Sequence, residues 1–518
     1  MDVSRWRTPG AGVLSGILFA LAFPPYGWTL LLPLALVPWI VALAVEQRRW
    51  RALASGALFG LSYWCVSVPW VAYVVTVYGG QPGAMGAVCV LLLAAILAEW
   101  PALVAWGTAA CAPAASWKRL AAFPLLWLAA EHTRSVVYGG FPWNLTASAL
   151  VRRPVWIQTA SVWGAYGIGF AVAAVSALLA GAVLRRRPAM AGAAAAAALA
   201  LGAFGVLRLA SSPAPGPERS LRVRLLQPNI REEDRRTPEG RAAGYRAVLA
   251  QGAEAARAGA DLLVFPESAF PMYWEQSSRL RDDLTRLARA CGCAILFNDV
   301  TTAPDGRAWN AARIVTPDGL ATGTYRKVHL VPFGEYVPLP RLFFFARQIS
   351  QEIGEFTPAA EPVVIRAGRV AVGVGVCYEI LYPPLARRQT LDGANLLATI
   401  SNDSWYGRGG AQEQHFAGAL LRAVENGRYL VRAAITGVSG IVDSRGRIVG
   451  EVAAGRAEVL AGRVALETGQ TAWTRWGHAL VPAADAGAAA VLIFGLARWR
   501  RERPARTPRP AALDGETE

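Results

Sequence analysis

The stretch that decides the fold runs from Val370 to Glu379 and reads VAVGVGVCYE. β-Branched residues alternate with small ones and no charge falls before its end, which predicts a buried strand. The strand ends at Cys377, followed by Tyr378 and Glu379. A thiol at this position, where the chain turns out of a sheet, faces a cleft and is not packed into the core.

Two other segments end in the same way. Residues 261–267 read DLLVFPE, a short apolar strand that ends in the carboxylate of Glu267. Residues 324–335 read TYRKVHLVPFGE, with the amine of Lys327 after a hairpin-like run and a second carboxylate at Glu335. A carboxylate, an amine and a thiol at strand ends predict a base, a charge stabiliser and a nucleophile.

The three motifs FPES, YRKVHLVPFGEYVP and GVCYE follow one another in this order along the chain. A lone strand cysteine is most often a small core residue, and a lone Lys or Glu usually lies on a solvated face. In combination and in this order, the motifs resemble the nitrilase (carbon–nitrogen hydrolase) superfamily. That resemblance implies a catalytic triad of Glu267, Lys327 and Cys377 in an α/β domain folded as an α-β-β-α sandwich.

The composition points to a membrane protein. The chain has 518 residues, of which 54% are hydrophobic and 17% charged, and its mean hydropathy is +0.31. That is too apolar for one soluble domain of this length. The net charge of +16 lies largely beside apolar runs, so it indicates membrane orientation and headgroup contact. No zinc-finger spacing or basic-aromatic repeat supports a nucleic-acid partner.

Apolar runs predict a transmembrane helical bundle of about eight spans. The predicted spans cover residues 13–23, 29–45, 52–77, 83–111, 120–136, 154–183, 188–210 and 479–497. The first run is not interpreted as a cleaved signal peptide, because Phe23–Trp28 is a poor cleavage site and a second apolar run follows at once.

Basic clusters predict the orientation of these spans. If both termini are cytoplasmic, the clusters at 5–7, 47–51, 118–119, 185–187 and 498–503 all fall inside, and only Arg152 and Arg153 fall outside. This follows the positive-inside rule. The predicted domains are seven spans over 1–211, an extracytoplasmic catalytic domain over 212–476, a last span over 477–498 and a basic, disordered cytoplasmic tail over 499–518.

The pattern between the last two spans alternates strands and helices. Expected strands cover 221–230, 261–267, 294–300, 370–376 and 395–402, with hairpins at 309–326 and 436–452, and expected helices cover 238–259, 280–290 and 413–427. Periodicity alone would give only an α/β class.

The six cysteines show no framework of paired spacings, so no disulfide is expected. Cys291 and Cys293, separated by one glycine, are interpreted as buried or free thiols. No second Cys/His pair lies near them in the sequence and the chain has four histidines, so no metal is expected.

A nitrilase-like domain inserted between the last two spans of a polytopic protein resembles the apolipoprotein N-acyltransferase family. The resemblance implies transfer of a fatty acyl chain from a phospholipid to the N-terminal α-amino group of diacylglyceryl-cysteine in lipoproteins, in the bacterial inner membrane. It implies ping-pong chemistry through a Cys377 thioester without a cofactor. Phospholipid donor, lipoprotein acceptor and membrane are the implied partners.

Each site residue then receives an expected role. Glu267 is the base, and Lys327 stabilises the oxyanion together with the backbone N–H of Tyr378. Glu335 orients Lys327 or balances the charge of the site. Tyr378 and Glu379 support the nucleophile or the substrate.

Other features leave alternatives open. The apolar-aromatic segment Leu339–Arg347 is either a core element or an arm that dips into the bilayer. Trp143 is expected in the interfacial aromatic belt, and His415 as a hydrogen-bonded scaffold residue. The rival functions are a membrane-tethered amidase that hydrolyses C–N bonds, and a transporter or receptor whose outer domain only binds a ligand.

Overall fold

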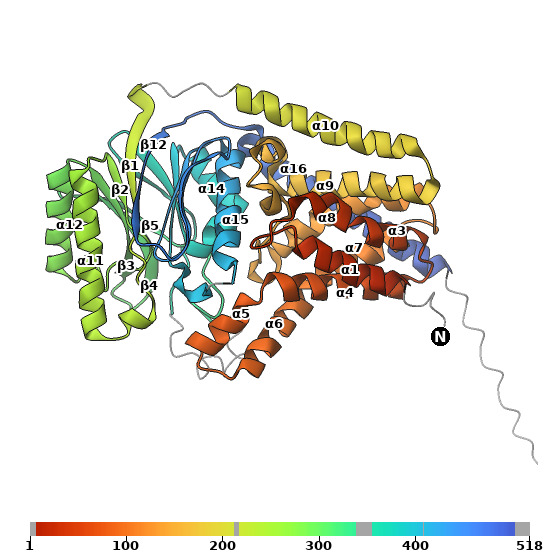
Figure 1. Ribbon diagram of the computed structural model, residues 1–518, viewed down its shortest axis with the longest axis horizontal. Coiled ribbons are helices and arrows are strands. Elements are labelled where there is room, and N and C mark those ends of the chain that lie inside the picture. The colour runs from red at the N-terminus through yellow and green to blue at the C-terminus, as the bar shows by residue number, and fades with distance from the viewer. Residues whose placement is uncertain (1–6, 212–216, 338–354, 408, 503–518) are drawn as a thin grey trace, which may run out of the picture.

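The computed structural model describes residues 7–211, 217–337, 355–407 and 409–502. Its layers run in the order helices, sheet, sheet, helices, and a bundle of further helices packs against the last layer (Figure 1). Helices α11 (Pro238–Arg257) and α12 (Ser278–Cys291) cover the outer sheet. Helices α14 (Pro383–Leu391) and α15 (Ala411–Asn426) lie between the inner sheet and the bundle. The predicted α-β-β-α sandwich is confirmed.

The outer sheet has the strand order β12–β1–β2–β3–β4–β5. Strands β1, β2 and β3 are parallel, and the other neighbours pair antiparallel. Leu225 of β1 lies opposite Val264 of β2, and Val264 opposite Leu296 of β3. The bounds are β1 (Ser220–Gln227), β2 (Leu262–Val264), β3 (Ala294–Thr302), β4 (Ala308–Val315), β5 (Ala321–Arg326) and β12 (Glu458–Ala465).

The inner sheet has the order β11–β10–β9–β8–β7–β6. Its strands β7, β8 and β9 are parallel, with Val374 opposite Ala398 and Ala398 opposite Val431. The bounds are β6 (Val364–Ala367), β7 (Val370–Val376), β8 (Leu396–Ser401), β9 (Leu430–Ala434), β10 (Ser439–Val442) and β11 (Ile448–Val452).

The core of the sandwich lies between the two sheets. Every residue of β7, β8 and β9 is buried, as expected for parallel strands that are covered on both faces. The facing side chains form one apolar cluster that includes Leu225, Val264, Leu296, Ile314, Val374, Ala398 and Val431. Burial of each aliphatic side chain of this size contributes roughly 1.5–3 kcal/mol, so this cluster holds the two sheets together.

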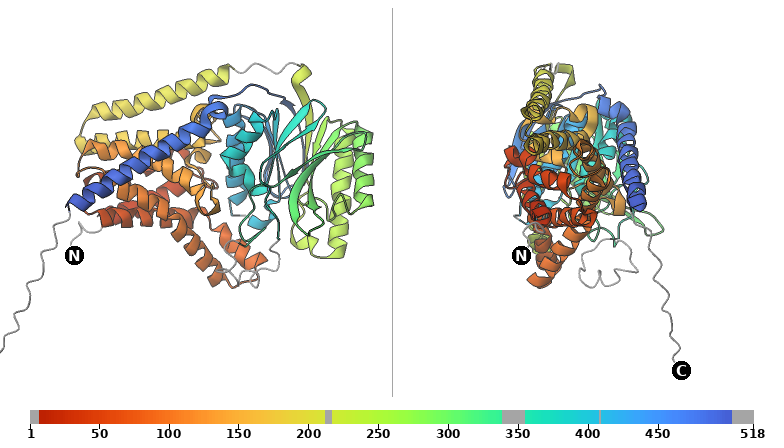
Figure 2. Two further views of the ribbon diagram at one scale, coloured as in Figure 1. Left: turned by 180° about the vertical axis from the view of Figure 1, so that it is seen from behind. Right: turned by 90° about the vertical axis from the view of Figure 1, so that its right-hand side faces the viewer.

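The bundle consists of helices that run lengthwise away from the sheets. Helix α1 begins, and helix α16 ends, at the end of the bundle remote from the sandwich (Figure 2). The bounds are α1 (Arg7–Ala20), α2 (Leu32–Ala35), α3 (Val37–Val45), α4 (Arg49–Ser67), α5 (Trp70–Tyr73), α6 (Gly83–Leu97), α7 (Glu99–Ala110), α8 (Trp117–Arg134), α9 (Ala160–Arg185), α10 (Pro188–Ala210) and α16 (Ala472–Glu502).

Short helical turns connect these elements. They are η2 (Thr29–Leu31), η3 (Val74–Tyr78), η4 (Val137–Gly139), η5 (Thr146–Leu150), η6 (Pro154–Ile157), η7 (Pro217–Arg219), η8 (Glu233–Arg235), η9 (Cys377–Leu381) and η10 (Asp403–Tyr406).

The prediction of about eight spans is only partly confirmed. Within the described residues, four helices are long and apolar enough to cross a membrane: Gly83–Ala110, Ala160–Arg185, Pro188–Ala210 and Ala472–Arg501. The pair Arg49–Ser67 and Trp70–Tyr78 is bent by 56° and counts as a fifth if it is one span. The helix α1 has 14 residues, and the segment Thr29–Val45 is a shorter apolar helix. The helix α8 carries four charged residues, Lys118, Arg119, Glu131 and Arg134.

Two further expectations need correction. Cys291 and Cys293 form a disulfide at the end of α12 with a Cα–Cα distance of 5.1 Å, so the interpretation as free thiols is wrong. The last helix continues to Glu502, so the predicted tail does not begin at 499. The remainder of that tail lies outside the described residues.

A buried arginine closes the remote end of the bundle. Helices leave their last carbonyl groups without intrahelical partners, and Arg119 of α8 donates to such groups at the ends of α3 and α7. Its Nη1 donates to the carbonyl of Leu43 at 2.9 Å, and its Nη2 to that of Ala109 at 2.7 Å. Its Nε donates to the carbonyl of Ala112 at 3.0 Å. One side chain therefore ties three helices together.

Replacing this arginine tests that role. Arg119→Met keeps the apolar stem but leaves several buried carbonyl groups unpaired, so we expect it to cost about 3 kcal/mol of unfolding free energy. Thermal unfolding in detergent should show a clearly lower midpoint. Lys118→Met, a change at the exposed neighbouring residue, is the matched control and should leave the midpoint unchanged. Equal midpoints for both variants would contradict the role of Arg119.

Candidate active site

Cys377 lies directly after β7, at the first residue of η9. Its backbone φ is +57°, a left-handed conformation that is uncommon for a residue other than glycine and that often marks functional sites. The turn is so tight that a Cβ on Gly375 would lie 2.9 Å from Ile380 of the same turn. The sequence GVGVC therefore folds into a sharp strand-to-helix turn with the thiol at its apex.

Glu267 follows β2 and lies almost fully buried in the sandwich. Its Oε1 accepts from Nδ2 of Asn310 at 2.9 Å, and its Oε2 accepts from the backbone N–H of Asn402 at 2.8 Å. Burial raises the pKa of the Glu267 carboxyl, the charge of Lys327 opposes this, and that of Glu335 adds to it. The carboxylate is thus a stronger base than an exposed glutamate.

Lys327 follows β5 directly and is 1% exposed. Its Nζ lies 3.0 Å from Oε1 and 2.8 Å from Oε2 of Glu335. Burial alone would lower the pKa of the Lys327 ammonium, but the charges of Glu335, Glu267 and Cys377 raise it above its ordinary value. Lys327 therefore stays charged throughout the physiological pH range.

The thiol of Cys377 accepts a hydrogen bond from Oγ of Ser401 with an oxygen–sulfur distance of 3.4 Å. Burial raises the pKa of Cys377, the charge of Glu267 adds to this, and the charge of Lys327 opposes it. The thiol is therefore protonated at neutral pH. It can become a nucleophile only when its proton passes to a base. The charges of Glu267 and Asp403 both act on the thiol, but Asp403 is paired with Arg432, which leaves Glu267 as the carboxylate that can accept the proton.

Asn310 of β4 joins the two carboxylates of the site. Its Nδ2 donates to Oε1 of Glu267 at 2.9 Å and to Oε1 of Glu335 at 2.8 Å. The second oxygen of Glu335 accepts from the backbone N–H of Val331 at 2.8 Å. One neutral amide thus holds two carboxylates beside a single ammonium, without adding a charge of its own.

Glu379 forms hydrogen bonds with the backbone and side chains around Cys377. Oε1 of Glu379 accepts from the N–H of Val376 at 2.7 Å and from the hydroxyl of Tyr325 at 2.7 Å. Its Oε2 accepts from the N–H of Val328 at 2.9 Å. Burial raises the pKa of Glu379 to about 7, against the opposing charge of Lys327. This carboxyl group braces the end of β7 against the segment that follows Lys327.

A second buried group of polar residues supports the thiol from behind. Nη2 of Arg432 lies 2.6 Å from Oδ2 of Asp403, and Nδ1 of His415 lies 3.0 Å from Oδ1 of the same carboxylate. Nε2 of His415 donates to the carbonyl of Cys377 at 3.1 Å. Burial lowers the pKa of His415, and Arg432 lowers it further, so the imidazole is neutral. With its one proton on Nε2, the ring accepts at Nδ1 from Nη2 of Arg432 at 3.2 Å. His415 is the hydrogen-bonded scaffold residue that the sequence predicts.

The donor atoms of Cys377, Asp403 and His415 lie within 4.8 Å of one another, a spacing that also suits a metal ion. Both ring nitrogens of His415 already have protein partners, Arg432 and the carbonyl of Cys377, and the same guanidinium neutralises Asp403. These residues therefore do not fit a metal site.

Sequence reasoning missed Asn310 and Arg432. The sequence from Ser401 to Gly407 resembles a structural motif of the superfamily, and Ser401 to Asp403 stand at the end of β8, as Cys377 stands at the end of β7. Asn310 and Arg432 interrupt apolar strands, where a buried polar residue indicates a specific partner.

The expectation for Trp143 is wrong. This side chain is 1% exposed and does not lie in an interfacial belt. Its Nε1 donates to Oε1 of Gln414 at 2.6 Å, and its ring stacks on Tyr378 with centroids 6.3 Å apart. The hydroxyl of Tyr378 donates to the carbonyl of Gly140 at 3.1 Å. The segment that joins α8 to α9 therefore packs directly behind the nucleophile. The predicted arm Leu339–Arg347 lies outside the described residues.

Comparison with known proteins gives two domain matches. Residues 222–473 match the family described as carbon-nitrogen hydrolase, and residues 15–178 match the apolipoprotein N-acyltransferase N-terminal domain. A solved amidase from Nesterenkonia sp. is 22% identical, with a TM-score of 0.37, and covers 50% of this chain and 95% of that chain. The sandwich and the domain match define an enzyme domain of the carbon-nitrogen hydrolase class.

Full-length relatives narrow the assignment. The apolipoprotein N-acyltransferase of Geobacter metallireducens is 33% identical over 96% of this chain and 99% of its own length. That of Methylococcus capsulatus is 31% identical over 95% of both chains. This chain belongs to the apolipoprotein N-acyltransferase family, whose members are acyltransferases.

Asn310 provides a test of the site that does not remove Glu267, Lys327 or Cys377. Its hydrogen bond lowers the pKa of Glu267, so Asn310→Ala should raise that pKa. If Glu267 must be deprotonated to act, the variant should lose activity on acidification at a higher pH than the wild type does. The measurement is the pH profile of acyl transfer, with rates at the pH optimum reduced about 10–100-fold. Asn298→Ala, which removes a partner of Asn310, is a milder control. If the acidic side of the pH profile of Asn310→Ala matches that of the wild type, the argument is contradicted.

Proposed function

We propose that this protein transfers a fatty acyl chain from a phospholipid to the N-terminal α-amino group of diacylglyceryl-cysteine in apolipoproteins, the last step of bacterial lipoprotein maturation. The observation that carries the proposal is the buried thiol of Cys377, with Glu267 and Lys327 around it, in a domain packed on an apolar helical bundle. Membership of the N-acyltransferase family supports the same assignment. The catalytic roles below are part of the proposal.

In the first half-reaction Cys377 attacks the ester carbonyl of the donor lipid. Its proton passes to Glu267, whose raised pKa makes it a suitable acceptor. The ammonium of Lys327 and the backbone N–H of Tyr378 stabilise the tetrahedral oxyanion. Glu267 then returns the proton to the leaving alkoxide, which departs as a lysophospholipid and leaves a thioester on Cys377.

In the second half-reaction the α-amine of the acceptor attacks the thioester. Glu267 removes a proton from this amine, and the thiol of Cys377 is restored. Glu335 keeps Lys327 in place through its two short contacts. No step needs a cofactor.

A membrane-tethered amidase would use the same three residues. The family assignment over 96% of the chain favours the acyltransferase. A bundle that packs directly against the turn containing Cys377 also favours a lipid substrate, because a single helix would suffice as a tether.

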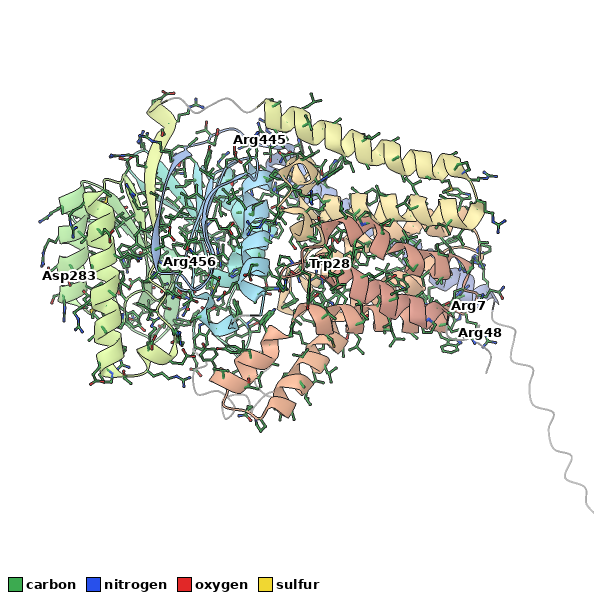
Figure 3. All side chains as sticks on the ribbon, in the orientation of Figure 1. Arg7, Trp28, Arg48, Asp283, Arg445 and Arg456 are labelled. Atoms are coloured by element: carbon green, nitrogen blue, oxygen red, sulfur yellow. A yellow bond between two sulfur atoms is a disulfide. The ribbon has the colours of Figure 1, made fainter. Side chains whose placement is uncertain are left out.

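We propose eight membrane crossings, with the sandwich outside the cytoplasm and both termini inside. The beginning of α1 and the end of α16 lie at one end of the bundle, which requires an even number of crossings. The basic residues Arg7 and Arg48 lie at that remote end, whereas Trp28 lies near the sandwich (Figure 3). This distribution agrees with the positive-inside rule. The domain limits 1–211 and 212–476 are proposed on the same basis, and the last span is placed within α16, which ends at Glu502.

The thioester tests the mechanism. Intact-mass analysis after incubation with donor phospholipid alone should reveal one added acyl group, which neutral hydroxylamine removes. Cys377→Ala should lack the adduct because the nucleophile is gone. Glu267→Gln should lose it with the base, and Lys327→Ala with oxyanion stabilisation, a contribution of about 3–4 kcal/mol. Cys111→Ala, a change at another buried cysteine, should acylate normally. An adduct that forms only when acceptor peptide is present would indicate a ternary mechanism.

A reporter tests the orientation. Gly306 lies at an exposed turn between β3 and β4, so an insertion there leaves the core intact. A reporter that is active only in the cytoplasm should be silent at this position and active after residue 502. Activity at Gly306 would mean that the number of crossings before the sandwich is even.

A further inference from the structure

A cavity of about 240 Å³ lies where the bundle meets the sandwich, on a face of α15 other than that of His415. Three segments line it: the turn after α1, the segment 148–153 and helix α15. The lining residues Glu413, Phe416 and Ala417 are spaced three and four residues apart, which places them on one face of α15. The cavity is thus separate from the thiol of Cys377, whose carbonyl contacts His415.

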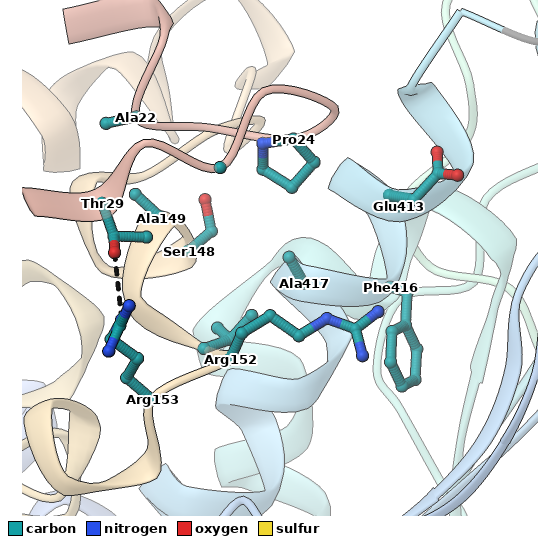
Figure 4. A pocket seen from close by; sticks show the side chains of 12 residues that line it. Ala22, Pro24, Thr29, Ser148, Ala149, Arg152, Arg153, Glu413, Phe416 and Ala417 are labelled. Atoms are coloured by element: carbon teal, nitrogen blue, oxygen red, sulfur yellow. Dashed lines mark hydrogen bonds between the residues drawn. The ribbon is translucent and has the colours of Figure 1, made fainter.

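Two opposite charges line this cavity without pairing with each other. The exposed Arg153 donates from Nε to Oγ1 of Thr29 at 3.2 Å, and among the described residues no carboxylate lies within ion-pair distance of it. Glu413, in the first turn of α15, likewise has no basic partner there. Figure 4 shows the two side chains on different sides of the cavity, with Ser148 and Ala417 between them.

The neighbouring arginine is already neutralised. Arg152 makes two hydrogen bonds to Glu451, at 2.6 and 3.0 Å, and its guanidinium lies 5.8 Å from the ring centroid of Phe416. Arg153 and Glu413 are therefore the charges that remain open to a ligand. The cavity therefore offers one positive group, the guanidinium of Arg153, and one negative group, the carboxylate of Glu413.

The surroundings indicate a lipid. Trp28 is 57% exposed and Leu30 is 76% exposed on the turn that lines the cavity, and Trp156 is also exposed beside the segment 148–153. Tryptophan and aliphatic residues exposed at the ends of apolar helices are typical of the headgroup region of a bilayer. In the proposed orientation, the cavity opens at the outer surface of the membrane.

We propose that this cavity binds the headgroup of an aminophospholipid, with Arg153 taking the phosphate and Glu413 taking the ammonium. A guanidinium suits phosphate oxygens because of its planar set of donors, and a carboxylate accepts from an ammonium. The acyl chains of such a lipid lie along Trp28 and Leu30. The lipid joins the first turn of the bundle to α15 and hence to the sandwich. This inference rests on the proposed orientation but not on the acyl-transfer mechanism.

Native mass spectrometry of the full chain with dialkyl-ether lipids tests the proposal, because ether lipids cannot donate an acyl chain to Cys377. The wild type should bind one dialkyl phosphatidylethanolamine about tenfold more tightly than the matched phosphatidylglycerol, which lacks the ammonium. Arg153→Gln should weaken the binding of both lipids about tenfold. Glu413→Gln should weaken the binding of phosphatidylethanolamine by a similar factor, and the binding of phosphatidylglycerol should be unchanged or tighter.

Controls separate this site from general lipid adsorption and from catalysis. Arg187→Gln and Glu458→Gln, at exposed positions away from the cavity, should bind both lipids as the wild type does. All variants should form the Cys377 thioester with ester lipids at the wild-type rate. Equal affinity of the wild type for the two lipids, or unchanged affinities in Arg153→Gln and Glu413→Gln, would overturn the proposal. Free phosphoethanolamine that binds as tightly as the lipid would overturn the assignment to a membrane ligand.

Discussion

The ion pair between Lys327 and Glu335 is the interaction on which the rest of the site depends. A buried ammonium costs several kcal/mol unless carboxylates and hydrogen bonds compensate it, and two carboxylates share this one cation. Removing the ammonium would leave Glu267 and Glu335 buried without a counter-charge, and removing Glu335 would free Lys327 to pair with Glu267 instead. Asn310 offsets part of the repulsion between the two carboxylates by donating to both. Glu267, the proposed base, is therefore able to accept a proton only because the ammonium of Lys327 is paired with Glu335.

The site also depends on the packing of the two sheets. Glu267 and Lys327 follow strands of the outer sheet, whereas Cys377 and Asn402 follow strands of the inner sheet. The hydrogen bond from the N–H of Asn402 to Glu267 crosses between them. Any shift of one sheet against the other would separate Glu267 from Cys377. The apolar cluster between the sheets thus positions the proposed base and nucleophile in addition to stabilising the fold.

The sequence predicts the parts of this structure that depend on local pattern. Strand ends at Glu267, Lys327 and Cys377, and the hairpin of β4 and β5, follow from alternation and turn residues. Contacts between distant segments have no such signature: Trp143 behind Tyr378 and the group of Asp403, His415 and Arg432 require the tertiary fold. The disulfide between Cys291 and Cys293 was missed because one intervening residue does not resemble a framework spacing. The predicted number of spans, about eight, exceeds the number of helices that are long and apolar enough to cross a membrane. Prolines and charged residues interrupt several of the predicted spans, as in α8.

The bundle explains how a carbon-nitrogen hydrolase fold can favour transfer over hydrolysis. A thioester on Cys377 survives only if water is kept from it until an amine arrives. Trp143 and Trp70, both from the bundle, pack with ring centroids 5.0 Å apart, and each contacts the ring of Tyr406 near the site. In the proposed mechanism, the part of the chain that holds the sandwich beside its lipid substrate also keeps water from the thioester, so the choice of lipid substrate and the choice of amine over water would have one structural origin.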